Sequence, residues 1–121
     1  MTGVQPAAEV ELFNGQPSTR TVAIFDSGSV LTVFSAEIAD LLGIDDVRTG
    51  ALQRINTLGG PADVYMFDLE IRLSAVGTRF GAQIGFFPTH VARNILGRGV
   101  VFSAFEIGFR ESTGEIHLRA E

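Results

Sequence analysis

The group best suited to chemistry in this chain is the carboxylate of Asp26, which follows the apolar run Val22–Phe25 and precedes Ser27, Gly28 and Ser29. An Asp followed by small residues at the end of a buried strand is held in a sharp turn rather than hidden. Two such carboxylates about 3 Å apart share one proton, because both cannot ionise at that distance. One can then take a proton from water while the other protonates a substrate. The chain has one such carboxylate, so a second copy must supply its partner.

Two further segments contain residues whose types, and whose distance in sequence from Asp26, suggest that they belong to the same site. The motif Asn94-Ile95-Leu96-Gly97-Arg98 begins 68 residues after Asp26. Between them lies Leu58-Gly59-Gly60, followed by Pro61. Two glycines and a proline interrupt strand pairing and predict a flexible hairpin tip or loop.

In these three segments, taken in this order, the chain resembles the retropepsin-like aspartic proteases, the family of retroviral proteases and their cellular and bacterial relatives. The resemblance extends over most of the chain, roughly residues 10–118. It implies a mostly β fold, a small closed antiparallel β-barrel with one or two short helices and one lobe per chain. It also implies a homodimer in which each subunit donates one Asp to a shared site on the two-fold axis, with no cofactor.

The resemblance assigns a role to each matching position. Asp26 is the catalytic residue, in an active-site loop with Ser27, Gly28 and Ser29, where Gly28 contacts substrate backbone and Ser27 bonds across the dimer. The flap that closes over substrate has its tip at Leu58, Gly59 and Gly60. Structural support beneath the loop comes from Ile95, Leu96, Gly97 and Arg98. Many retroviral members carry an acidic partner for this arginine just after the Asp motif, where this chain has Val30 and Leu31, so the partner of Arg98 stays open.

These observations predict an aspartic endopeptidase that acts on protein or peptide substrates. The alternative is a non-catalytic dimeric module that keeps the fold and binds or assembles with peptides. A third possibility is a monomer that acts only within a larger partner.

Composition and charge exclude several other classes of function. The formal net charge is -5 and the nine basic residues are scattered, which argues against binding to nucleic acid or to an anionic membrane surface. The absence of cysteine excludes thiol chemistry, and His90 and His117 lack spaced partners for a metal site. Ser27, Ser29 and His90 lack the G-x-S-x-G context of a serine hydrolase. No secretory signal and no apolar run of roughly 20 residues is visible, so the cytoplasm is the expected location.

The elements that must position these residues are mostly strands. Residues 1–9 are expected to be loose and 10–121 to form one protease domain. A strand is predicted at Val10–Phe13, before a tight turn at Asn14-Gly15. A second strand is predicted at Arg20–Phe25, and its apolar end, Val22–Phe25, is expected to be covered on both faces. The firmest prediction is Tyr65–Leu73, which alternates strictly between apolar and polar residues.

The remaining segments predict one or two small helices and further short strands. After an apolar segment over 30–34, Ser35 is expected to cap a helix that buries Ile38, Leu41 and Leu42 and stops at Gly43. A strand is expected over Phe80–Phe87. Helical spacing follows at Val101, Phe102 and Phe105. A final hairpin is predicted around Ser112-Thr113-Gly114, from the alternation of Ile107 with Phe109 and of Ile116 with Leu118.

Overall fold

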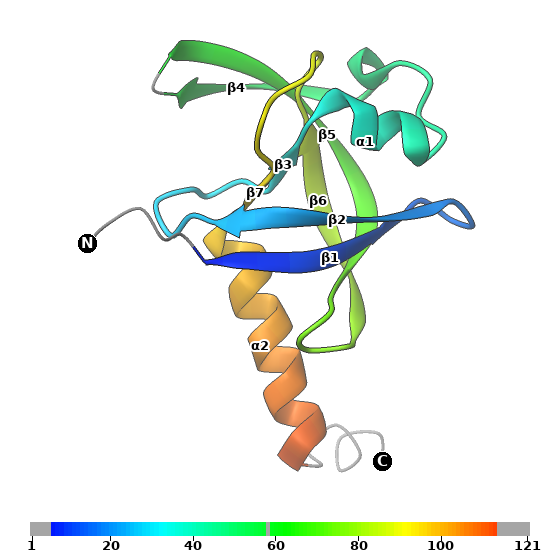
Figure 1. Cartoon of the computed structure of the whole chain (residues 1–121), viewed down its shortest axis with the longest axis vertical. Coiled ribbons are helices and arrows are strands. Elements are labelled where there is room, and N and C mark those ends of the chain that lie inside the picture. The colour runs from blue at the N-terminus through cyan, green and yellow to red at the C-terminus, as the bar shows by residue number, and fades with distance from the viewer. Residues whose placement is uncertain (1–5, 58, 114–121) are drawn as a thin grey trace.

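The computed structural model describes residues 6–57 and 59–113, and within them the chain is mostly β (Figure 1). The prediction of a mostly β fold with one or two helices is confirmed, although the second helix is long. The elements are β1 Ala7–Phe13, β2 Ser18–Phe25, β3 Val33–Phe34, α1 Ala36–Leu41, the 3₁₀ helix η1 Val47–Thr49, β4 Ala51–Thr57, β5 Gly60–Leu73, β6 Arg79–Phe86, β7 Ile95–Leu96 and α2 Arg98–Thr113.

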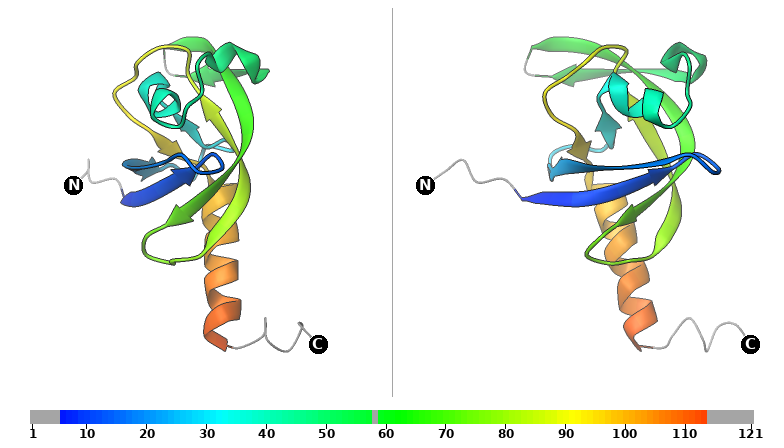
Figure 2. Two further views of the ribbon diagram at one scale, coloured as in Figure 1. Left: turned by 90° about the vertical axis from the view of Figure 1, so that its right-hand side faces the viewer. Right: turned by 45° about the vertical axis from the view of Figure 1, so that its right-hand side comes forward.

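The seven strands form one sheet in the order β1-β2-β7-β3-β6-β5-β4, and β1 also pairs with β5. The sheet is mixed rather than purely antiparallel, because β2 pairs with β7 and β3 pairs with β6 in parallel. Strand β5 is long and curved, so that its first half pairs with β4 while its second half pairs with β1 (Figures 1 and 2). The parallel pairs bring the ends of β2, β3 and β7 together at the centre of the sheet.

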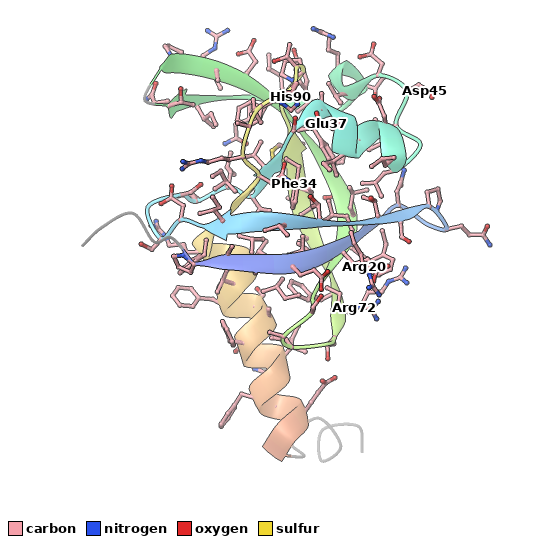
Figure 3. All side chains as sticks on the ribbon, in the orientation of Figure 1. Arg20, Phe34, Glu37, Asp45, Arg72 and His90 are labelled. Atoms are coloured by element: carbon pink, nitrogen blue, oxygen red, sulfur yellow. The ribbon has the colours of Figure 1, made fainter. Side chains whose placement is uncertain are left out.

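Burial along β5 follows the predicted alternation from Asp68 to Leu73, but in the first half of the strand Met66 is buried and Phe67 is only half-buried. Leu69, Ile71 and Leu73 are buried, whereas Asp68 and Glu70 are exposed. The buried side chains join a core that includes Phe34, which is labelled in Figure 3. The largest fully buried members of the core are Phe34, Phe86, Leu12, Leu42, Ile71, Ile84 and Leu96. Each such side chain contributes about 1.5–3 kcal/mol relative to an exposed one, so the sheet is held chiefly by this core.

The first two strands differ from the prediction in two respects. Strand β1 begins at Ala7, within the segment expected to be loose, because Ala7 pairs with Ile24 of β2. Strand β2 is not covered on both faces in the single chain. Ala23 is buried, but Val22 is 55 % exposed, because only one face of β2 meets the core.

The first helix forms where it was predicted, between Ser35 and Gly43. Gly43 takes a φ of 77°, a conformation that favours glycine and ends the helix. Ser35 has extended backbone geometry, but its side chain makes no capping hydrogen bond. Leu41 is 60 % exposed and so does not join Ile38 and Leu42 in the core.

The predicted hairpin around residues 112–114 is wrong in its first half, where α2 continues as a helix to Thr113 and includes Ile107 and Phe109. The helix is favoured because Val101 and Ala104 bury one of its faces in the core. Glu106 and Arg110 also form an i,i+4 ion pair at 3.1 Å. The predicted partner strand with Ile116 and Leu118, and also His117, lies outside the described residues. The helix projects away from the sheet (Figures 1 and 2).

Across residues 6–57 and 59–113, neither α-helix combines the length and the apolar character that crossing a membrane requires.

Candidate active site

Asp26 lies at the surface, directly after β2, in a tight loop that its own side chain helps to shape. Its Oδ1 accepts a hydrogen bond of 2.9 Å from the backbone N–H of Gly28. Its carbonyl oxygen accepts one of 3.0 Å from the N–H of Ser29. The Ser29 hydroxyl donates to the carbonyl of Leu31 at 2.7 Å. The loop therefore holds the carboxylate exposed, with one oxygen engaged by backbone.

Strand β7 and the start of α2 support this loop from behind. The N–H of Asp26 donates to the carbonyl of Leu96 at 3.1 Å, and the N–H of Arg98 donates to the carbonyl of Ser29 at 3.0 Å. The Arg98 guanidinium donates to the carbonyl of Ser27 at 3.1 Å. Its partner in the described chain is therefore a backbone oxygen of the loop, which answers the question that Val30 and Leu31 left open.

Gly97 sits where two backbone segments touch. Its N–H donates to the hydroxyl of buried Thr32 at 2.8 Å. A Cβ at position 97 would lie 2.7 Å from the carbonyl oxygens of both Val30 and Leu31. Only glycine fits this approach without moving the segment that follows Asp26.

Strands β4 and β5 form a hairpin at the position predicted for the flap. Thr57 pairs with Gly60 across its end, and the Thr57 hydroxyl donates to the carbonyl of Gly60 at 2.7 Å. The same hydroxyl oxygen accepts from the N–H of Gly59 at 3.2 Å. Gly60 has a φ of 113°, which a residue with a side chain rarely adopts. Leu58, predicted at the tip, lies outside the described residues.

A cleft of about 980 Å³ lies between the Asp26 loop, the hairpin and the segment before β7. It brings together Asp26, Gly28 and Ser29 of the predicted active-site loop with Gly59 of the predicted flap. Ile95 also reaches the cleft, whereas Ser27, Gly60, Leu96, Gly97 and Arg98 are not among its lining residues within the described chain. The lining consists of Asp26, Gly28, Ser29, Val33, Ile55, Asn56, Thr57, Gly59, Phe87, Val91, Ala92, Arg93 and Ile95.

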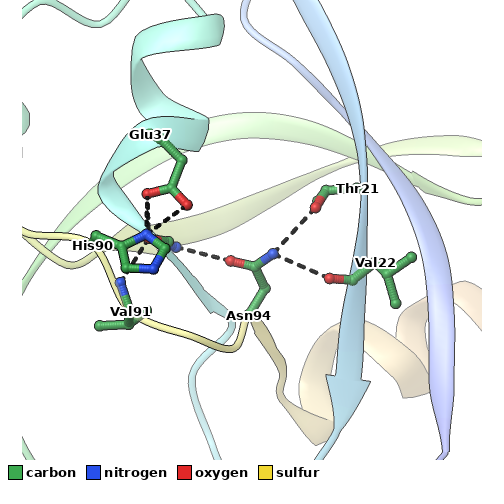
Figure 4. Close-up of polar contacts among 7 residues, drawn as sticks. Thr21, Val22, Glu37, His90, Val91 and Asn94 are labelled. Carbon is green, nitrogen blue, oxygen red and sulfur yellow. Dashed lines mark hydrogen bonds and ion pairs between the residues drawn. The ribbon is translucent and has the colours of Figure 1, made fainter.

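The wall formed by residues 91–93 was not predicted from the sequence, and neither was the role of Asn94, the first residue of the predicted motif, whose side chain fixes that wall. The Asn94 Oδ1 accepts from the N–H of Ser35 at 2.9 Å. Its Nδ2 donates to the hydroxyl of Thr21 at 3.2 Å and to the carbonyl of Val22 at 3.1 Å (Figure 4). One amide thus joins β2, the start of α1 and the segment leading into β7. A polar residue directly before an apolar motif was the available signal, but its partners are too distant in sequence to infer.

A second polar cluster anchors the same wall at α1. The Ser35 hydroxyl donates to Oε1 of Glu37 at 2.5 Å and accepts from the N–H of Val91 at 2.8 Å. Nδ1 of His90 lies 3.0 Å from Oε2 of Glu37 (Figures 3 and 4). The pKa of the Glu37 carboxyl lies below its usual range. The largest cause is the hydrogen bond from the Ser35 hydroxyl, followed by the backbone N–H of Glu37 and by His90.

This cluster gives an expected dependence on pH. Because the pKa of Glu37 is lower in the folded chain than in the unfolded chain, the ionised side chain stabilises the fold above the usual glutamate pKa. That contribution is lost as pH falls through the lowered pKa. Glu37→Gln should therefore reduce the free energy of unfolding at neutral pH, and the difference from wild type should shrink in acid. Denaturant titrations of wild type and Glu37→Gln from neutral to acid pH measure this difference in the free energy of unfolding. A difference that is constant with pH would contradict the lowered pKa of Glu37.

Among the described residues no group of three or more acidic or histidine side chains is arranged to hold a metal ion. The polar groups of the cleft are one carboxylate, the side-chain amide of Asn56, two small hydroxyls, backbone amides and Arg93. Such a set can bind an extended peptide and carry out proton transfer. Comparison of the chain with protein-family models and with curated protein sequences finds no match.

Proposed function

We propose that this protein is an aspartic endopeptidase of the retropepsin type, active as a homodimer. The observation that carries the proposal is that Asp26 and the β4–β5 hairpin, separate in sequence, line one cleft. Peptide hydrolysis by paired acids needs a carboxylate that faces the substrate cleft, and in the proposed enzyme the hairpin beside the cleft closes over the bound peptide.

The pairing of the strands supports a closed barrel as the finer description of the fold. Since β1 pairs with both β2 and β5, hydrogen bonding runs from β1 through β2, β7, β3, β6 and β5 and returns to β1. Closure of this kind pairs both sides of the strands within the ring, with β4 outside it, and gives a rigid base for a loop. The Asp26 loop leaves that base at the end of β2, where β7 supports it.

In the proposed mechanism two Asp26 side chains face each other across the two-fold axis and share one proton. The ionised carboxylate takes a proton from a water molecule as that water attacks the scissile carbonyl carbon. The protonated partner hydrogen-bonds to the carbonyl oxygen, and the resulting tetrahedral intermediate collapses as the amide nitrogen gains a proton. No covalent enzyme intermediate forms and no cofactor takes part.

The cleft walls favour extended peptides with large apolar side chains. Val33, Ile55, Phe87, Val91 and Ile95 line it from four different parts of the chain. Apolar walls with a few fixed polar groups bind the side chains of a substrate while backbone amides orient its main chain.

The test is incubation of the purified protein with a peptide library from about pH 3 to pH 8, with products identified by mass spectrometry. We expect cleavage beside large apolar residues, with the highest rate in mild acid and a rate per chain that rises with protein concentration as dimers form. A dimeric protein that binds library peptides but cleaves none at any pH would instead support the non-catalytic peptide-binding module.

A further inference from the structure

One face of α2 exposes large apolar side chains to solvent. Phe102 is 69 % exposed and Phe105 is 59 % exposed. The adjacent face of the helix, which carries Val101 and Ala104, is buried in the core. Arg98, Phe102 and Phe105 are spaced by four and three residues and therefore share one face of the helix. We call Phe102 and Phe105 the α2 row.

The α2 row is a direct continuation of the Asp26 loop. Arg98, at the head of the same face, bonds through its N–H to the carbonyl of Ser29 and through its guanidinium to the carbonyl of Ser27. Phe102 follows Arg98 by about 6 Å along the helix axis, one turn later. A partner that contacts the Asp26 loop beside Arg98 would therefore also contact the α2 row.

A groove of about 410 Å³ runs beside the row, between the start of β1 and α2. Its lining is largely apolar and includes Pro6, Ala7, Phe25, Leu96, Val101 and Phe105. Phe25 immediately precedes Asp26, so the groove extends the apolar surface from the loop to the row. Exposed aromatic residues beside an apolar groove are typical of the centre of a protein–protein interface.

We propose that the α2 row is the main contact between the two copies of this chain, each row packing against the α2 helix and the β1–α2 groove of the partner. This inference rests on the proposed function, which requires a two-fold axis beside Asp26. Because Arg98 is bonded to the loop, an axis that brings the two Asp26 side chains together also brings together the first turns of both α2 helices. The partner that covers the α2 row is thus a second copy of this chain, and the interface is self-complementary.

The experiment compares wild type with the double variant Phe102→Glu/Phe105→Glu, with Leu41→Glu as a matched control. Leu41 is equally exposed but lies on α1, away from the proposed axis. Sedimentation equilibrium should show the dimer dissociation constant of the double variant raised at least about 100-fold, since central aromatic residues dominate interface energies. The control should match wild type, and circular dichroism should be the same for all three proteins.

A second variant tests the contact without introducing charge. The chain contains no cysteine, so Phe102→Cys provides a single thiol for a short bismaleimide cross-linker. We expect efficient cross-linking to a species of twice the chain's mass, and none for Leu41→Cys.

The outcomes separate this inference from the proposed function. A double variant that stays dimeric overturns the interface, whether or not it cleaves peptides. A wild-type dimer that the double variant disrupts supports the interface even if neither protein cleaves, in which case the proposed function alone fails. A wild-type chain that is monomeric at all concentrations overturns the interface.

Discussion

Asp26→Asn should abolish peptide cleavage while leaving the fold and the dimer nearly unchanged. The asparagine Oδ1 can still accept the hydrogen bond from the N–H of Gly28, so the loop keeps its shape. An amide, however, can neither take a proton from water nor return one, and loss of such a group lowers rates by at least about 10²-fold. The measurement is the rate of cleavage of a library-derived peptide, with the dimer verified by sedimentation. Cleavage at the wild-type rate would refute the assignment of Asp26.

Asp45→Asn is the matched control, since it makes the same chemical change at another exposed aspartate on the side of the molecule opposite the Asp26 loop (Figure 3). It should cleave as wild type does. Mixing wild type with Asp26→Asn in equal amounts then tests the sharing of the site. After full exchange of subunits, activity should fall to about a quarter of that of the same total of wild-type chains if each dimer needs both carboxylates, and only to about half if each chain works alone.

What could be predicted from the sequence was local. The turn at Asp26, the hairpin at Gly59 and Gly60, and the alternation along β5 each depend on residues close together in the chain, whose preferences act wherever the segment lies. The position of the Asp26 loop against Gly97 and Arg98 came from the order of motifs in a resembling family. Local preference alone could not give it, because 71 residues separate Ser27 from Arg98.

What the sequence did not reveal depends on tertiary contacts or on competing periodicities. Ile107 and Phe109 alternate as strand residues do, but burial of Val101 and Ala104 against the sheet keeps them in α2. Strand β4 has mostly exposed side chains and so lacked an apolar pattern. The bonds that fix residues 91–93, from Asn94 to Thr21 and Val22, join segments more than 70 residues apart. The local errors thus fall where a distant partner decides the structure.

Gly97→Ala should both destabilise the fold and reduce cleavage. The new Cβ would lie 2.7 Å from the carbonyl oxygens of Val30 and Leu31, which are backbone atoms and cannot rotate away. The free energy of unfolding should fall by about 1–3 kcal/mol, as in other overpacked sites. The displaced segment follows directly from the Asp26 loop, and a shift of about 1 Å in a catalytic group lowers rates by about 10²-fold. Denaturant titration and cleavage assays on the folded fraction measure the two effects separately.

Gly99→Ala provides the comparison two residues away. A Cβ at position 99 meets no atom within 4 Å, and the residue lies in the first turn of α2. Because alanine favours a helix over glycine, this variant should be unchanged or more stable by up to about 1 kcal/mol, with wild-type cleavage. If Gly97→Ala behaved like Gly99→Ala, the close approach of β7 to residues 30–31 would not control the Asp26 loop. If only Gly97→Ala lost cleavage, and the folded fraction of that variant was also less active than wild type, then β7 would be the support that positions the Asp26 carboxylate.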